Sequence, residues 1–415
     1  PAWVQCVERF HPGLIDNLER LASQVDGYAE LVDLYKEVAP DILDGEIQIR
    51  CYLRAADIAH AILEDADTAR EYYVKVLDMD GENEQAMNAL EQIYEDAEQW
   101  PELFEIYRRK VQTTLDEDRR REILFKQARV CEVNLEDVSG AAQTYEQILE
   151  SAPESGPAIE SLERLYPQLD RWADLMDLLD RKVDLEDSEG RVALLHRLGR
   201  LADEQLGDEE RSLDYFRRAL EADPGHAETL AALEAAMEDE ARRGRVAEIL
   251  EPVYKQRGDW SKLATALDAR LETTDDPMER KELLRQIGTV YEEQLGDLER
   301  AFETFARLFK EDYEDRGTWD LLTRLGGVLE NYERLAEVLA EVLDDVVADS
   351  PDTAELAFML GELYEGRLDK PDEARAAYQR VLAFSPDDEK AFSAVERMLL
   401  ATESWPDLPE LYRDA

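Results

Sequence analysis

The sequence predicts an all-α protein, a solenoid of stacked antiparallel helix hairpins. Three observations carry this prediction: an aromatic residue recurs at nearly constant spacing, apolar residues within each copy follow helical steps of three and four, and no segment shows the alternation of a strand. The 415-residue chain is longer than one compact core usually serves, but 44% hydrophobic residues with 19 Gly and 15 Pro predict a chain folded throughout.

The recurring aromatic residue sets the length of the repeat. It stands in the segments GYAELVDLYKEV, QWPELFEIYRRKV, RWADLMDLLDRKV, DWSKLATALDARL, NYERLAEVLAEVL and SWPDLPELYRDA, with successive spacings of 72, 72, 88, 72 and 73 residues. The aromatic residues are Tyr28, Trp100, Trp172, Trp260, Tyr332 and Trp405. One continuous array over residues 1–415 is therefore expected, in units of about 1–27 (partial), 28–99, 100–171, 172–259, 260–331, 332–404 and 405–415 (partial).

The first helix of each unit begins at this aromatic residue. After Trp100 come Leu103, Tyr107 and Val111, which lie on one stripe of a helix. Pro101 falls in the first helical turn, where no amide is needed. Because the stripe recurs in six copies, we interpret Trp100 as a packing residue rather than as the wall of an aromatic ligand site.

The second helix ends in a turn of the pattern Leu-x-Asp, whose Asp is expected to cap the third helix. The pairs are Leu63/Asp65, Leu135/Asp137, Leu206/Asp208 and Leu295/Asp297, and the fifth copy has Leu368 followed by Asp369 and Lys370.

The third helix carries a small residue followed four positions later by an aromatic one, a pattern that lets two helices approach closely. The aromatic residues are Tyr73, Tyr145, Phe216, Phe305 and Tyr378. Pro153, Pro224 and Pro386 end this helix in three copies, and a fourth helix follows.

The second and third helices resemble a tetratricopeptide repeat (TPR). The resemblance is best in LLHRLGRLADEQLGDEERSLDYFRRALEADPGHAETL, where the family's marker positions are at or near Leu195, Leu198, Gly199, Ser212, Phe216, Ala219 and Pro224. The fourth helix and the following aromatic-led helix resemble a degenerate partner repeat. The resemblance implies a right-handed superhelix with a concave groove, and it implies protein binding without naming a partner.

The 88-residue spacing between Trp172 and Trp260 predicts one extra helix near residues 245–256. A single added helix would reverse the direction of everything after it, so we expect a break in the superhelical path or a bent helix near Gly244 and Pro252. Arg242, Arg243 and Arg245 make a basic patch there, a candidate for partner binding or for a hinge. A tolerated variant of the repeat is the alternative.

The excess of acidic residues indicates which classes of partner the chain is expected to bind. The chain has 99 Asp+Glu against 48 Lys+Arg, a formal charge of -51, which argues against direct nucleic-acid binding and anionic membrane surfaces. We expect a protein partner with a basic segment, bound in an acidic groove; a merely solvated acidic surface is the alternative. No apolar run reaches about 18 residues. Three scattered cysteines, Cys6, Cys51 and Cys131, favour a reducing, cytoplasmic compartment.

No residue pattern predicts an enzyme, a cofactor or a metal. The histidines His11, His60, His196 and His226 are dispersed and lack metal-ligand spacing, and there is no phosphate-loop or nucleophile-elbow pattern. The segment 78–85, DMDGENEQ, has its glycine at the wrong position for a calcium loop and is expected to be a turn.

Two other functional hypotheses stay open. The partial units at both ends favour a regulatory or recognition arm of a larger multidomain enzyme or signalling protein, with further domains in the same chain. The absence of polar capping helices favours a self-assembling structural spacer, whose repeats stack end to end.

Overall fold

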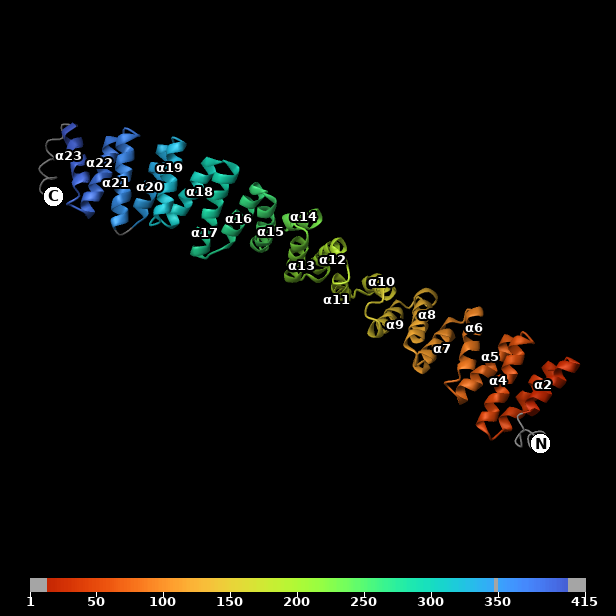
Figure 1. Ribbon diagram of the computed structural model, residues 1–415. Helices are drawn as coiled ribbons and strands as arrows, with labels where there is room; N and C mark the ends of the chain where they lie inside the picture. The colour runs from red at the N-terminus through yellow and green to blue at the C-terminus, as the bar shows by residue number, and fades with distance from the viewer. Residues whose placement is uncertain (1–12, 347–349, 402–415) are drawn as a thin grey trace. The chain divides into compact units, whose positions relative to one another are not determined.

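The computed structural model describes residues 13–346 and 350–401, and these residues form helices joined by short turns, with no strand among them (Figure 1). The predicted all-α repeat fold is confirmed. Cys6, His11 and Trp405 lie outside the described residues. The chain forms two compact units, here called unit 1 (residues 1–186 and 201–207) and unit 2 (187–200 and 208–415).

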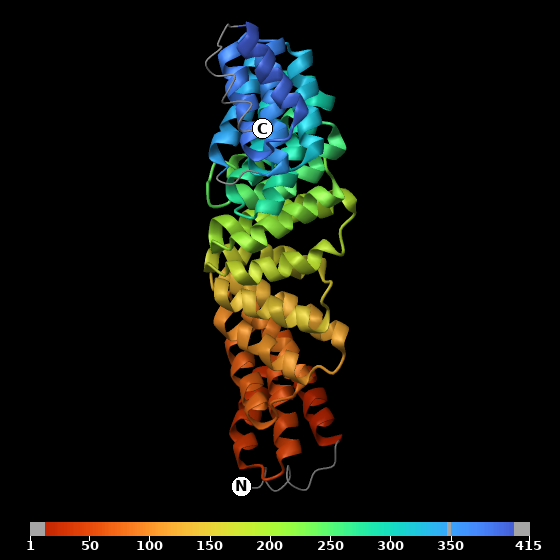
Figure 2. The same cartoon turned by 90° about the vertical axis from the view of Figure 1, so that its left-hand side faces the viewer.

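Unit 1 is a series of helices in which each packs on the next one along the chain, and short connections make neighbours antiparallel (Figure 2). Its helices are α2 (Gly13–Val25), α3 (Tyr28–Val38), η1 (Ala39–Asp41), α4 (Gly45–Ala61), α5 (Ala66–Met79), α6 (Glu84–Asp96), α7 (Trp100–Thr113), α8 (Glu117–Arg129), η2 (Val130–Asn134), α9 (Val138–Ser151), α10 (Gly156–Leu165), η3 (Tyr166–Leu169), α11 (Trp172–Val183) and η4 (Ala202–Leu206).

Unit 2 has the same construction, and from α13 onward each helix packs on its successor. Its helices are α12 (Ser188–Leu201), α13 (Glu209–Ala222), α14 (Ala227–Ala236), α15 (Arg243–Arg257), α16 (Trp260–Thr273), α17 (Pro277–Thr289), η5 (Val290–Leu295), α18 (Leu298–Glu311), α19 (Arg316–Val328), α20 (Tyr332–Asp345), α21 (Pro351–Gly366), α22 (Pro371–Phe384) and α23 (Glu389–Ala401).

The aromatic marker is the first residue of its helix in each described copy, at α3, α7, α11, α16 and α20. Two residues before it, the backbone is left-handed, for example at Glu98 (φ 54°) and Gly258 (φ 73°). The amide of the next residue then donates to a carbonyl five residues back, as Gln99 does to Tyr94 at 2.9 Å. This closure is a Schellman turn, which satisfies the last carbonyls of the preceding helix. Each described marker is half-buried.

The turn between the second and third helices uses the expected aspartate caps. Asp65 Oδ1 accepts the amide of Thr68 at 3.1 Å, and Asp137 Oδ1 accepts that of Gly140 at 2.9 Å. Asp208 and Asp297 cap α13 and α18 in the same way. The N-cap prediction is confirmed at these four positions, whereas Lys370 stands at the N-cap of α22, which has no side-chain cap.

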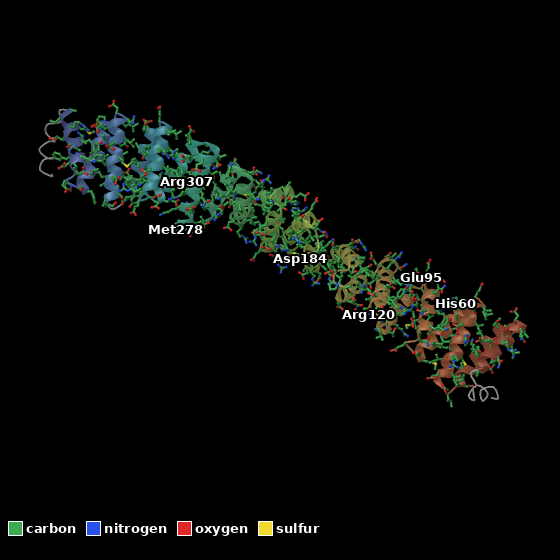
Figure 3. The ribbon with its side chains drawn as sticks, viewed as in Figure 1. His60, Glu95, Arg120, Asp184, Met278 and Arg307 are labelled. Carbon is green, nitrogen blue, oxygen red and sulfur yellow. The ribbon has the colours of Figure 1, made fainter. Side chains whose placement is uncertain are left out.

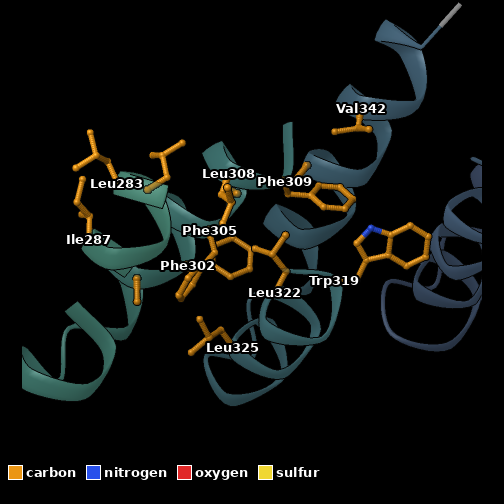
Figure 4. Packing of buried hydrophobic residues seen from close by; sticks show 14 of the residues in the cluster. Leu283, Ile287, Phe302, Phe305, Leu308, Phe309, Trp319, Leu322, Leu325 and Val342 are labelled. Atoms are coloured by element: carbon orange, nitrogen blue, oxygen red, sulfur yellow. The ribbon is translucent and has the colours of Figure 1, made fainter. Parts of the chain in front are cut away.

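The core depends on close approach between the second and third helices. A Cβ added to Gly288 on α17 would lie 2.6 Å from the ring of Phe305 on α18, and one on Gly361 would meet Tyr378 at the same distance. Gly199 and Phe216 repeat this contact, so a missing side chain on one helix makes room for a ring on the next. Figure 4 shows the resulting apolar packing around Phe305 in unit 2.

The region of the predicted insertion contains α15. This helix contacts both α13 and α14 and pairs with α16. Pro252 lies inside it, so the helix lacks one internal amide donor at this point. Leu250, Val253 and Tyr254 stand at the same distances before Trp260 as the corresponding residues of α6 before Trp100, and α15 therefore recreates the end of α6 ahead of the aromatic-led helix.

Within residues 13–346 and 350–401, no helix combines the length and the apolar character that a membrane span requires.

Candidate protein-binding site

A hollow of unit 1 lies where α6, the end of α7 and the start of α8 meet. It has a volume of 480 Å³, and we call it the α6–α8 pocket. Its apolar wall includes the buried side chains of Met87 and Ile123, and Leu115 stands at its edge in the α7–α8 turn. The amphipathic pattern of α6 and α8 turns their apolar residues toward the core and leaves polar residues around the opening.

The floor of the α6–α8 pocket is a buried lysine. Lys110 is only 7% exposed, and its ammonium donates to Asn88 Oδ1 at 2.6 Å and to the carboxylate of Glu91. Lys126 donates to Glu91 Oε1 at 2.7 Å, and the hydroxyl of Tyr107 donates to the same oxygen at 3.2 Å. Two cations therefore share one carboxylate.

Ionisation of Glu91 follows from these contacts. Burial alone would raise its pKa, but hydrogen bonds from Lys110 and Lys126 outweigh burial and hold the pKa of the Glu91 carboxyl below its usual value. Burial, reinforced by the charge of Glu91, raises the pKa of the Tyr107 phenol. The floor is thus a charged, hydrogen-bonded cluster near neutral pH, with Glu91 as its acceptor.

The rim of the α6–α8 pocket is acidic. Glu84 pairs with Arg119, and Asp116 caps α8 by accepting the Arg119 amide at 2.8 Å. Glu82 and Glu122 are exposed, and among the described residues neither side chain has an ion pair or hydrogen bond. Five carboxylates and three cations line the pocket in all, so its lining has an excess of negative charge.

The Lys110–Glu91 pair recurs along the chain. Lys182 Nζ donates to Glu163 Oε1 at 2.9 Å, and Arg270 contacts Glu251, each across 19 residues in sequence. These pairs were not predicted from the sequence. A basic residue ten positions after the tryptophan, matched by a glutamate nine positions before it, is the signal that would have found them.

The three arginines of the insertion contact groups of unit 2. Arg242 Nε lies 3.5 Å from Asp239, Arg243 Nη1 lies 3.1 Å from Glu272, and Arg245 contacts Glu209. Arg243 also donates to the carbonyl of Met237 at 3.1 Å. These contacts tie α15 to its neighbours, and a role of the arginines in partner binding stays a prediction.

The fold brings together two histidines that the sequence shows as dispersed. Nδ1 of His196 and Nδ1 of His226 lie 3.1 Å and 2.7 Å from the hydroxyl oxygen of Thr229, and His226 caps α14. His60 lies on α4 of unit 1 (Figure 3). In the part of the chain that the structure describes, no group of three or more His, Cys, Asp or Glu side chains is arranged to hold a metal.

The comparisons with known proteins agree with the fold. Family models described as "Tetratricopeptide repeat" match residues 192–226 and 329–389. A search of curated proteins gave no match. These matches support a protein-interaction scaffold as the broad role of the chain.

Three solved structures show distant likenesses to this chain. One is the structure of Naa15/Naa10 bound to HypK-THB, with 15% identity, a TM-score of 0.34, and coverage of 93% of this chain and 62% of that one. YrrB, a TPR protein with an unusual peptide-binding site, shows 15% identity, a TM-score of 0.25, and coverage of 44% and 91%. The P58(IPK) TPR domain shows 14% identity, a TM-score of 0.23, and coverage of 94% and 97%.

Proposed function

Because the chain is a helical repeat protein with tetratricopeptide repeats, we propose that it is a noncatalytic scaffold whose α6–α8 pocket binds a basic segment of a partner protein. In this proposal the pocket is part of the acidic groove that the charge balance predicts. A repeat array offers long, preformed surfaces, and its ligands are commonly segments of other proteins.

The observation that carries the proposal is the pair of unneutralised carboxylates on the rim. Among the described residues of unit 1, no cation pairs with Glu82 or Glu122, and both stand beside a hollow large enough for a long side chain. Leu115, 94% exposed, supplies an apolar surface next to them. Lys and Arg side chains join an aliphatic stem to a cationic head, so the stem would lie on Leu115 and the head between the carboxylates.

An acidic ligand fits the pocket less well. Lys110 on the floor and the more exposed Lys126 both already contact Glu91, and Arg119 contacts Glu84. A ligand carboxylate would have to displace one of these carboxylates and would then face the negative rim. A ligand cation would meet two rim carboxylates, Glu82 and Glu122, that have no ion pair among the described residues.

The test is fluorescence anisotropy of a labelled hexa-arginine peptide, with hexa-glutamate as a charge control. The variant Glu82→Lys with Glu122→Lys is expected to weaken arginine-peptide binding roughly tenfold, since each exposed charge contributes up to about 1 kcal/mol before reversal. The matched control is Glu37→Lys with Glu160→Lys, two exposed glutamates of unit 1 outside the pocket that give the same change in net charge. Equal weakening in both variants would show that total charge, not the pocket, binds the peptide.

A further inference from the structure

Unit 2 contains a second pocket at the corresponding place in its own repeat. It has a volume of 520 Å³ and lies between α15, the end of α16 and the start of α17; we call it the α15–α17 pocket. Its lining includes Arg270, Thr273, Thr274 and Glu279 from α16, α17 and the turn between them. From α15 and the turn before it come Glu240, Glu248 and Arg245.

The two pockets occupy equivalent positions 160 residues apart, the distance that separates Trp100 from Trp260. Lys110, Thr113 and Thr114 of the first correspond to Arg270, Thr273 and Thr274 of the second. Both turns then continue to an aspartate that caps the next helix: Asp116 accepts the Arg119 amide, and Asp276 accepts the Met278 amide at 3.0 Å. A shared backbone pattern therefore builds both hollows.

The floors of the two pockets differ in charge. In the α15–α17 pocket, Arg270 contacts Glu251 and donates to Glu279 Oε1 at 2.6 Å, so one cation lies between two carboxylates. Thr274 donates to the other oxygen of Glu279 at 2.7 Å. Glu279 stands where the α6–α8 pocket has Arg119, and Gln286 stands where it has Lys126. The second floor is the more negative one.

The rim of the α15–α17 pocket comes from the inserted region. Glu240 and Glu248 are exposed, and no ion pair or hydrogen bond to either side chain occurs among the described residues. Glu248 takes the position of Asn88, and Gly244 lets α15 pack against the turn, since a Cβ there would lie 2.4 Å from Thr273 Oγ1. The insertion thus supplies two carboxylates without a counter-charge among the described residues, while the third charged residue of this rim, Arg245, contacts Glu209.

We propose that the α15–α17 pocket is a second binding site for a basic protein segment, so that one chain binds two such segments, one in each unit. This rests on the proposed function of the α6–α8 pocket. Asp275 replaces the exposed Leu115 in the second turn, so the second site offers charge without the apolar contact. Binding there depends more steeply on salt, because exposed charge pairs are screened and apolar contacts are not.

Isothermal titration of the full chain with hexa-arginine tests the inference. We expect two peptides per chain at low salt, with one site lost on raising the salt concentration before the other. Glu240→Lys with Glu248→Lys should remove the α15–α17 site and leave the less salt-sensitive α6–α8 site. Glu82→Lys with Glu122→Lys should remove the α6–α8 site and leave the more salt-sensitive one. The combined variant should bind no peptide at either site. Circular dichroism of each variant checks that it is folded.

The outcomes separate the two proposals. One peptide per chain, removed by the Glu82/Glu122 variant alone, overturns the second site and leaves the first. Two or more peptides whose number neither variant changes overturn both pockets as sites, because diffuse charge then explains the binding. No saturable binding at any salt concentration overturns the proposed function and the second site with it.

Discussion

The ammonium of Lys110 and the carboxylate of Glu91 form a buried ion pair that joins α7 to α6. Its two members are not equally dependent on each other. Glu91 keeps Lys126 if Lys110 is removed, whereas Lys110 keeps only Asn88 if Glu91 is removed. The pair also lines the α6–α8 pocket. Its contribution to stability is measured by denaturation, and its role at the site is measured by peptide binding.

Removing Glu91 should therefore cost more than removing Lys110. We expect Glu91→Ala to lower the free energy of unfolding by about 3 kcal/mol, because it leaves a buried ammonium without its counter-charge. Lys110→Val should cost about 1 kcal/mol or less, since Val38 and Val342 occupy the same position in other copies. Urea denaturation of both variants gives the comparison; a larger loss for Lys110→Val would contradict this account.

The same carboxylate predicts a pH dependence. The pKa of Glu91 is lowered in the folded chain, so its contribution is fully present above the unfolded value of about 4.3 and is lost as pH falls through the folded pKa. Wild type should lose stability relative to Glu91→Gln as the pH is lowered from about 5 to 3. Thermal melts across this pH range show whether the stability difference between the two proteins changes in the expected direction. Parallel curves for the two proteins would show that Glu91 does not titrate as described.

Left-handed turn residues offer stabilising substitutions. Glu98 has φ 54° where the equivalent residue before Trp260 is Gly258. Glu98→Gly should raise the free energy of unfolding by about 0.5 kcal/mol, because glycine adopts this conformation without the steric cost of a Cβ. Gly296→Glu is the matched reverse change: its φ is 65° and a Cβ there meets nothing within 4 Å, so a loss of similar size would come from the backbone alone. Denaturation midpoints that move the other way would refute the assignment.

Close packing between α17 and α18 should be sensitive to one methyl group. Gly288→Ala is expected to cost about 1 to 3 kcal/mol, since its Cβ would overlap the Phe305 ring. Gly327→Ala on α19 meets no atom within 4 Å, so it should be neutral or slightly stabilising. The two melting temperatures, measured side by side, decide whether the ring contact or the glycine itself sets the cost.

Substitution of Trp100 distinguishes a packing role of this residue from a role in ligand binding. Because it is half-buried at the start of α7, Trp100→Ala should cost about 2 kcal/mol, less than the loss expected for a fully buried tryptophan. Hexa-arginine affinity of the folded variant should stay within twofold of wild type. Unchanged stability combined with lost peptide binding would revive the aromatic ligand site.

The apolar packing positions could be predicted from the sequence, but the polar cluster around Glu91 could not. Spacing alone located the helix that begins at Trp100 and the caps at Asp65 and Asp137, because apolar periodicity and capping chemistry are local signals. The burial of Lys110 was not predicted, because a lysine in a helix is usually exposed. Its burial depends on Glu91 in the preceding helix, a tertiary contact that becomes visible only when polar positions are compared between copies.

Two other features could not be predicted from the sequence, one because its turn residue is unusual and the other because it depends on tertiary packing. Glutamate is not a usual marker of left-handed backbone, so Glu98 gave no sign that it ends α6 in a Schellman turn. His196 and His226 lie 30 residues apart in sequence, and only the packing of α12 and α14 brings both to Thr229. The α6–α8 pocket likewise combines three helices, so no single segment displays it.

The central claim is that a basic segment binds at the α6–α8 pocket, and the most direct measurement is a map of the contact. A hexa-arginine peptide carrying a photo-crosslinker can be irradiated with the full chain and the cross-linked residues identified by mass spectrometry. We predict cross-links concentrated in residues 82–126, which disappear in Glu82→Lys with Glu122→Lys and persist in Glu37→Lys with Glu160→Lys; the second pocket would add a separate group in 240–279. Cross-links spread over the chain in proportion to its exposed carboxylates would contradict the claim.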